Sequence, residues 1–193
     1  SEICSSNRTF LRICADENHP FWNAVIQRMG VSGWMGEEGG MGGEGDDPLW
    51  KVPSRPGELS PKQFYLTLCN MEEVPDFWMQ NNKQLVMKAL PSSITHIGTS
   101  AFQGCSSLAL QALPPNLESI GSHAFYMCKS LVLDAPNALP PSIEDIDDSA
   151  FSGCTSLSLQ ALPPNLESIG TFMFSGCTSL ALQELPPKLE VIS

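Results

Sequence analysis

The chain has 193 residues, 42% of them hydrophobic, and its twenty-one Asp and Glu outnumber its ten Lys and Arg, giving a formal net charge of −11. Nucleic acids and anionic membrane surfaces are bound through basic side chains, so this charge disfavours both as partners. No apolar run approaches the roughly 18–20 residues of a transmembrane helix, and no signal-peptide pattern opens the chain, so membrane insertion is not expected.

Residues 1–84 are predicted to form a small helical module. Apolar side chains recur near a period of 3.6 residues in "SEICSSNRTFLRICADENHPFWNAVIQRMG", where a second helix is expected from Pro20 to Gly30. A third helix is predicted for "SPKQFYLTLC", with Ser60 as its N-cap. Residues 36–48 are rich in Gly and acidic side chains, a composition typical of a disordered loop.

Part of this module resembles the rear half of an F-box, in the form found in repeat proteins of giant viruses and protists. The resemblance is carried by residues spread over the first two predicted helices and a later tail: Cys4, Asn7, Phe10, Ile13, Cys14, Asp16, Phe21, Trp22, Trp50, Phe64, Tyr65 and Leu68. It implies a Skp1-type adaptor as a partner of the full-length protein. The Leu-Pro opening and first helix of an F-box, which supply much of the adaptor contact, are missing from these residues.

The second half of the chain is built from internal repeats. "LQALPPNLESIG" occurs at 110–121 and again at 159–170, and four units of 23, 26, 23 and 23 residues follow a half unit at 85–96. These units are 97–119, 120–145, 146–168 and 169–191. Duplication at this period is typical of stacked coils that share one core, so the repeat domain is predicted at 85–193. Because the chain opens on Ser1 and stops two residues into a new unit, we expect a fragment of a longer protein.

Each repeat carries the same structural signals. The Leu-x-Leu alternation predicts a short strand, which the following Pro-Pro ends. Gly98, Gly121 and Gly170, with Asp147 at the same position, predict a corner with positive φ, and the Phe-x-Gly-Cys stretch predicts a short helical or 3₁₀ turn. Two ladders of buried side chains are expected, formed by Phe102, Phe125, Phe151 and Phe174 and by Cys105, Cys128, Cys154 and Cys177.

The pattern "IGTSAFQGCSSL…LPPNLESIG" resembles the BspA-like class of leucine-rich repeats. This resemblance implies an α/β solenoid, an array of short strands and turns, that is right-handed and used for protein contacts, with no implied chemistry. The helical module is then expected to cap the first coil, whose apolar end needs a cover.

The seven cysteines form neither a CxxC pair nor the Cys/His spacing of a zinc site. Buried free thiols in a reducing compartment are predicted, which favours a cytoplasmic protein. The alternatives are a disulfide framework and a cell-surface or secreted protein with an upstream signal peptide.

No catalytic, cofactor or metal site is predicted. The acidic cluster of Glu144, Asp145, Asp147 and Asp148 lacks the spacing of a calcium loop and is interpreted as a solvated corner. Outward-facing residues after each Leu-x-Leu, together with the "APN" insertion of the 26-residue repeat, are predicted to bind a protein with a neutral or basic surface. These residues are Gln111, Asp134, Ala135, Pro136, Asn137, Gln160, Gln183 and Glu184.

The sequence therefore predicts a non-enzymatic scaffold for protein–protein interaction, most simply a substrate-recognition adaptor of the F-box and ubiquitin-ligase type. Two alternatives stay open, a BspA-like adhesin or antigen at the cell surface and a structural subunit of a larger assembly.

Overall fold

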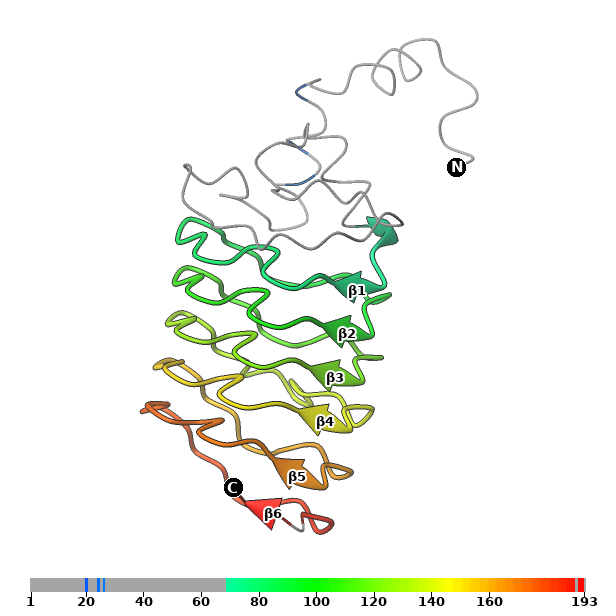
Figure 1. Ribbon diagram of the computed structural model, residues 1–193, viewed down its shortest axis with the longest axis vertical. Helices are drawn as coiled ribbons and strands as arrows, with labels where there is room; N and C mark the ends of the chain where they lie inside the picture. Colours follow the sequence, from blue (N-terminus) through cyan, green and yellow to red (C-terminus); the bar gives the residue numbers. More distant parts are fainter. Residues whose placement is uncertain (1–19, 21–23, 25, 27–68, 190, 193) are drawn as a thin grey trace.

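The structure, a computed structural model, describes residues 20, 24, 26, 69–189, 191 and 192. Successive coils stack along the long axis of the molecule, and each contributes one two-residue strand to a single column (Figure 1). The strands are β1 (Glu73–Val74), β2 (His96–Ile97), β3 (Ser119–Ile120), β4 (Asp145–Ile146), β5 (Ser168–Ile169) and β6 (Val191–Ile192). All pairings are parallel, in the order β1-β2-β3-β4 and, separately, β5-β6.

The register of the strands follows the repeat. Val74 pairs with Ile97, Ile97 with Ile120, and Ile120 with Ile146, so equivalent side chains lie over one another. Each of these four side chains is at most 3% exposed. One face of each strand therefore points into a core that is continuous from coil to coil, which confirms the predicted solenoid.

The aromatic ladder is the central feature of that core. Phe102, Phe125 and Phe151 are fully buried and stack with ring centroids 5.5 Å and 5.4 Å apart. Phe174 continues the stack at 6.0 Å, and Trp78 contacts Phe102 edge to face at 5.9 Å. Parallel, offset rings of this kind bury large apolar areas that no single coil can bury alone.

The array begins earlier than the predicted boundary at residue 85. β1 lies at residues 73–74, and Val74 takes the position that Ile occupies in later coils. The first coil departs from the repeat pattern because Trp78 and Met79 stand where the next three coils have Ala and Phe. Their side chains are buried, 7% and 2% exposed, so the core continues despite the change in sequence.

The strands do not lie where the Leu-x-Leu alternation predicted them. They are formed by the Ile of each repeat and the residue before it. The Leu-x-Leu segments run alongside one another with isolated bonds, such as Leu133 N–H to the carbonyl of Leu110 at 3.1 Å and Gln183 N–H to that of Gln160 at 3.1 Å. Isolated bonds of this kind do not make a continuous ladder.

The predicted positive φ at Gly98, Gly121 and Gly170 is wrong. The recurring left-handed residues lie two and six positions further on, at Phe77, Ser100, His123, Ser149 and Phe172, and at Asn81, Gly104, Met127, Gly153 and Gly176; Leu133 and Asn137 of the 26-residue unit are also left-handed. Gly121 is required for space instead, since a Cβ there would lie 2.8 Å from the backbone nitrogen of Thr99. The left-handed residues also replace the predicted helical turn by separate turns, because a positive φ interrupts a right-handed helix.

Most of the predicted helical module lies outside the described residues, including the loop at 36–48 and the residues that carry the F-box resemblance. Pro20, Ala24 and Ile26 are helical, as expected for the segment from residue 20 to 30, and Ile26 is 1% exposed within the hydrophobic core cluster. In the described part of the chain, no helix has the length and apolar character needed to cross a membrane.

Candidate functional site

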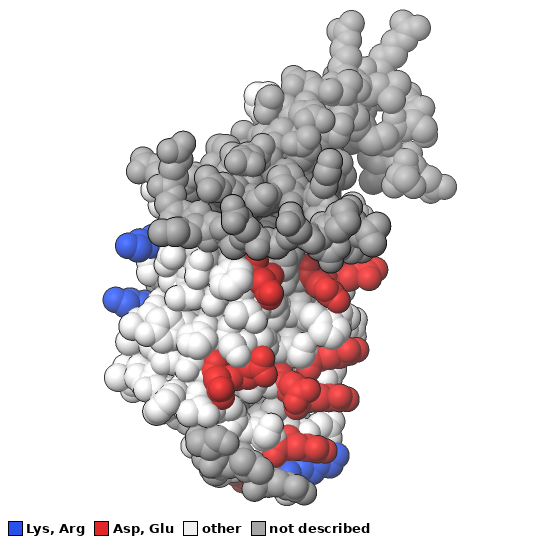
Figure 2. Space-filling model, in the orientation of Figure 1, with Lys and Arg blue, Asp and Glu red and all other residues white. Residues whose placement is uncertain are grey.

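The outward face of the strand column carries most of the acidic side chains of the described repeats. The carboxylates come from the strands, from the residue before each strand and from the corner after it (Figure 2). All are exposed: Glu72, Glu73, Asp76, Glu118, Glu144, Asp145, Asp147, Asp148 and Glu167. Among the described residues, no Lys forms an ion pair with this acidic strand face; the imidazole of His96 is its one close basic neighbour, with Nε2 3.8 Å from Oε2 of Glu118.

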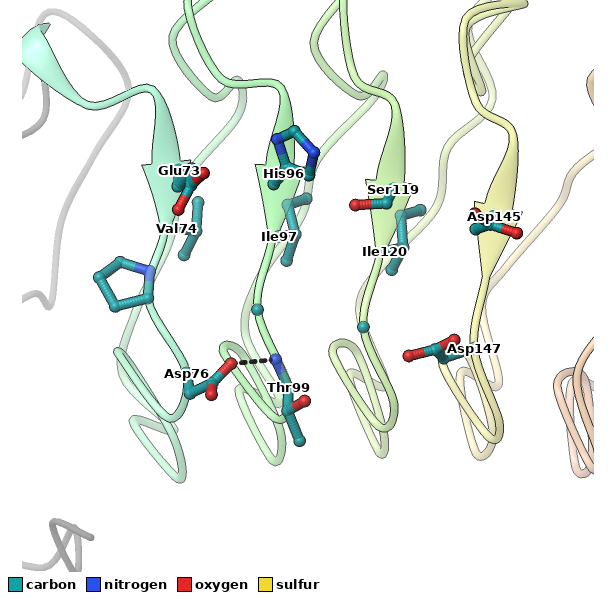
Figure 3. A pocket seen from close by; sticks show the side chains of 13 residues that line it. Glu73, Val74, Asp76, His96, Ile97, Thr99, Ser119, Ile120, Asp145 and Asp147 are labelled. Atoms are coloured by element: carbon teal, nitrogen blue, oxygen red, sulfur yellow. Dashed lines mark hydrogen bonds between the residues drawn. The ribbon is translucent and has the colours of Figure 1, made fainter. Parts of the chain in front are cut away.

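A groove of about 360 Å³ crosses this face over the first four strands. The strand register places Glu73, His96, Ser119 and Asp145 in one row, because their Ile or Val neighbours point inward and they point outward. Corner residues form a second row beside it, and Figure 3 shows both rows facing the same opening. The second row consists of Pro75, Gly98, Gly121 and Asp147, the residues directly after the strands, and Asp76 and Thr99 lie one position further along the chain.

The groove has two acidic ends and a neutral middle. Glu73 and Asp76 lie at the first coil, and Asp145 and Asp147 lie at the fourth (Figure 3). Between them the floor is made by Gly, Ser, Thr and Ile residues together with His96.

Hydrogen bonds fix several of these side chains. Oδ1 of Asp76 accepts the backbone N–H of Thr99 at 2.6 Å, and Asp148 accepts that of Thr171 in the same way at 2.6 Å. On β2, Nδ1 of His96 lies 2.7 Å from the hydroxyl of Thr95. Asp145 has no such bond in the described structure, and Asp147 has only a long contact of 3.4 Å with the hydroxyl of Ser122. The fourth-coil carboxylates are therefore the more available pair.

The cysteine ladder is inside the solenoid, away from this groove. Cys105, Cys128 and Cys154 are buried, Cys177 is partly buried, and all four are free thiols. Each Sγ–H donates to a backbone carbonyl of the previous coil at 3.0–3.1 Å. Burial raises the pKa of Cys105 to about 12 and also raises the pKa of the other three. These thiols are held neutral and unreactive, as structural cysteines are.

The partner-binding residues predicted from the sequence form a different surface. Gln111, Asp134, Gln160, Gln183, Glu184, Pro136 and Asn137 are exposed, and Ala135 is partly buried. The structure brings them together in a column, since the N–H of Ala135 bonds to the carbonyl of Gln111 at 3.2 Å. None of them lines the groove on the strand face. Their role in binding stays a prediction.

Sequence reasoning missed the groove because it placed the strands elsewhere. Of the acidic cluster interpreted as a solvated corner, Asp145 and Asp147 line the groove. The available signal was the polar residue directly before each Ile or Val of the repeat, which is Glu73, His96, Ser119 or Asp145. No group of three or more potential metal ligands is found within the described residues.

Comparison with known proteins places the chain among repeat proteins. The family model described as "BspA type Leucine rich repeat region" matches residues 72–193 in six copies. A leucine-rich repeat protein from Bacteroides ovatus is similar at 31% identity and a TM-score of 0.53, over 63% of this chain and 31% of that one. A leucine-rich cell surface protein from Faecalibacterium prausnitzii is similar at 29% identity and 0.53, over 62% and 32%. The chain spans about a third of the length of these two proteins. No curated protein matches it.

Proposed function

The chain belongs to the BspA-type leucine-rich repeat family, and we propose that it is a non-enzymatic scaffold that binds another protein through the exposed side of its repeats. The observation that supports this most is the acidic strand face, where nine exposed carboxylates are arranged by a rigid stack of coils. A surface of one charge on a rigid scaffold selects a partner of opposite charge and speeds its association. A neutral or basic protein is therefore the proposed partner.

We further propose that the scaffold is the recognition part of a substrate adaptor of the F-box and ubiquitin-ligase type in a reducing compartment. The F-box-like residues of the N-terminal module and the five free thiols of the described chain support this role. A cell-surface role is the second candidate, because the similar protein from Faecalibacterium prausnitzii is named as a cell surface protein.

Affinity capture of proteins by the complete chain tests the scaffold function. Binding of a purified Skp1-type adaptor to the complete chain tests the ubiquitin-ligase role. We expect a basic protein to be captured reproducibly at low salt and released as salt rises, because exposed charges are screened. A complete chain that captures no protein above the level of an unrelated acidic control would contradict the scaffold. If the chain captures a partner but does not bind the adaptor, the scaffold function is supported and the ubiquitin-ligase role is contradicted.

A further inference from the structure

The groove on the strand face of the first four coils is lined by carboxylates only at its two ends, and the carboxylate of Glu118, which is not part of the lining, lies 3.8 Å from Nε2 of His96. At the first coil Glu73 and Asp76 border the groove, and at the fourth coil Asp145 and Asp147 do so. The two central coils contribute His96, Thr99, Ser119 and small or apolar groups (Figure 3). A ligand that matches this surface carries two positive charges separated by a neutral stretch.

The separation follows from the strand spacing. Neighbouring strands lie about 4.8 Å apart, so the three intervals from β1 to β4 cover about 14 Å. An extended peptide rises about 3.4 Å per residue and points alternate side chains the same way, so residues i, i+2 and i+4 face one side. Residues i and i+4 are then about 14 Å apart, the distance between the two acidic ends.

Resting on the proposed scaffold function, we propose that this groove binds an extended basic segment of a protein partner, with Lys or Arg at positions i and i+4 and a small residue at i+2. One basic side chain meets Glu73 and Asp76, and the other meets Asp145 and Asp147. The small residue at i+2 faces the middle of the groove, where the side chain of His96 stands beside Ser119. The two central coils line the groove with no carboxylate, and the carboxylate of Glu118 beside it already contacts Nε2 of His96.

The complete chain and two peptides of equal composition test this proposal. "GKASAKG" carries its two Lys at i and i+4, whereas "GKKASAG" carries them side by side. Titrations followed by backbone amide shifts at low salt are expected to show at least fivefold tighter binding of the first peptide. The shifted amides are expected to lie at residues 73, 74 and 76, 96–99, 119–121 and 145–147.

A matched pair of variants locates the binding. Asp145→Asn with Asp147→Asn removes two charges from one end of the groove and is expected to weaken the first peptide about five- to tenfold, the range of two exposed charge pairs. Asp134→Asn with Glu184→Gln removes the same charge from the other exposed column and is expected to change affinity less than twofold. Should the first variant fail to fold, Glu73→Gln at the opposite end gives the same readout for one charge.

Three results would overturn the proposal: equal affinity for the two peptides, equal weakening by both variants, or no binding of either peptide. The first two would indicate diffuse attraction to an acidic surface. If the captured partner of the complete chain persists with Asp145→Asn and Asp147→Asn, the groove is not its binding site, while the scaffold function stands.

Discussion

At the scale of single residues, the fold depends on side chains that can be buried only by the next coil. Phe125 stacks on Phe102 on one side and on Phe151 on the other, at nearly parallel ring angles of 6° in both cases. The ladder positions of Leu108, Leu131 and Leu157 are likewise 0% exposed. Each such residue belongs to two interfaces, so one substitution weakens two neighbouring coils.

Phe151→Ala is therefore expected to cost about 3–5 kcal/mol in unfolding free energy, as truncations of buried aromatic side chains do. Denaturant unfolding of both proteins measures the difference. Phe172→Ser is the control, because Phe172 is 70% exposed and Ser occupies the same position in two other coils. The control is expected to change stability by about 0.5 kcal/mol or less. Equal losses in the two variants would remove Phe151 from the core.

The buried thiols make stability depend on alkaline pH. Their ordinary pKa is 9.0, and burial raises the pKa of Cys105 to about 12 and those of Cys128 and Cys154 as well. Above pH 9 the unfolded chain loses these protons while the folded chain keeps them. Stability is thus full below pH 9 and falls as pH rises toward 12, by up to about 1.4 kcal/mol per pH unit for each thiol.

Unfolding free energies measured from pH 8 to about 10.5 test this dependence. Cys128→Ala is expected to reduce the slope by one thiol's contribution, whereas Phe172→Ser, which alters an exposed side chain and removes no thiol, is expected to leave the slope unchanged. A slope identical in all three proteins would show that the ladder thiols do not control it.

The buried ladder residues were predictable from the sequence, because each ladder consists of one residue type at one position of the repeat. The Phe and Cys ladders needed only the period of the repeat. The left-handed positions were not predictable in this way. Phe77, Ser100, His123, Ser149 and Phe172 share a positive φ but no side-chain chemistry. The closure of the coil imposes this conformation on the backbone, whatever the residue type.

At the scale of elements, each strand has two residues and is held by its neighbours rather than by its own length. The Leu-x-Leu segment and the Ser-Ile segment both alternate between buried and solvent-facing residues, so the side-chain period alone could not tell which forms the ladder. The backbone hydrogen bonds show which of the two segments forms the ladder. Gly98 N–H bonds to the carbonyl of Val74 and Gly121 N–H to that of Ile97, both at 2.8 Å, and so extend the ladder past the strand.

These corner glycines give a prediction for the whole strand column. Gly121→Ala would place a Cβ 2.8 Å from the nitrogen of Thr99 and 2.9 Å from the carbonyl carbon of Gly98, and backbone atoms cannot move aside without opening the ladder. The expected loss is about 1–3 kcal/mol in unfolding free energy, as for other overpacked sites. Asp147→Ala is the control, because the fourth coil already holds a Cβ at this position, and it is expected to cost about 0.5 kcal/mol or less. Equal stability of Gly121→Ala and the parent chain would mean that the corner can accommodate a Cβ.

At the scale of the whole molecule, the described residues from β1 onward form one array of coils, and the sequence of its first coil departs from the repeat. Residues 74–84 lack the Cys of later coils, so the sequence alone assigns them to the helical module, although Trp78 packs edge to face against the buried ring of Phe102. A coil at the end of an array faces different neighbours from an internal coil, so its sequence departs from the repeat. The acidic strand face could be predicted only in part, since it requires knowing which residues share a row across coils.

The last prediction follows from this one-dimensional architecture. Deleting residues 146–168 removes one complete coil and joins Asp145 to Ile169, so every ladder keeps its register. This variant is expected to fold and to melt in one transition at a lower temperature than the parent chain, because one set of neighbour contacts is lost. Deleting residues 146–157 removes half a coil and places Ser158 where an Ile is required, so it is expected to unfold or aggregate. Circular dichroism melts of the two variants distinguish these outcomes. If both deletions are tolerated equally, register between equivalent side chains is not what stabilises the array, and the stacked ladders of Phe and Cys are a consequence of the fold rather than its cause.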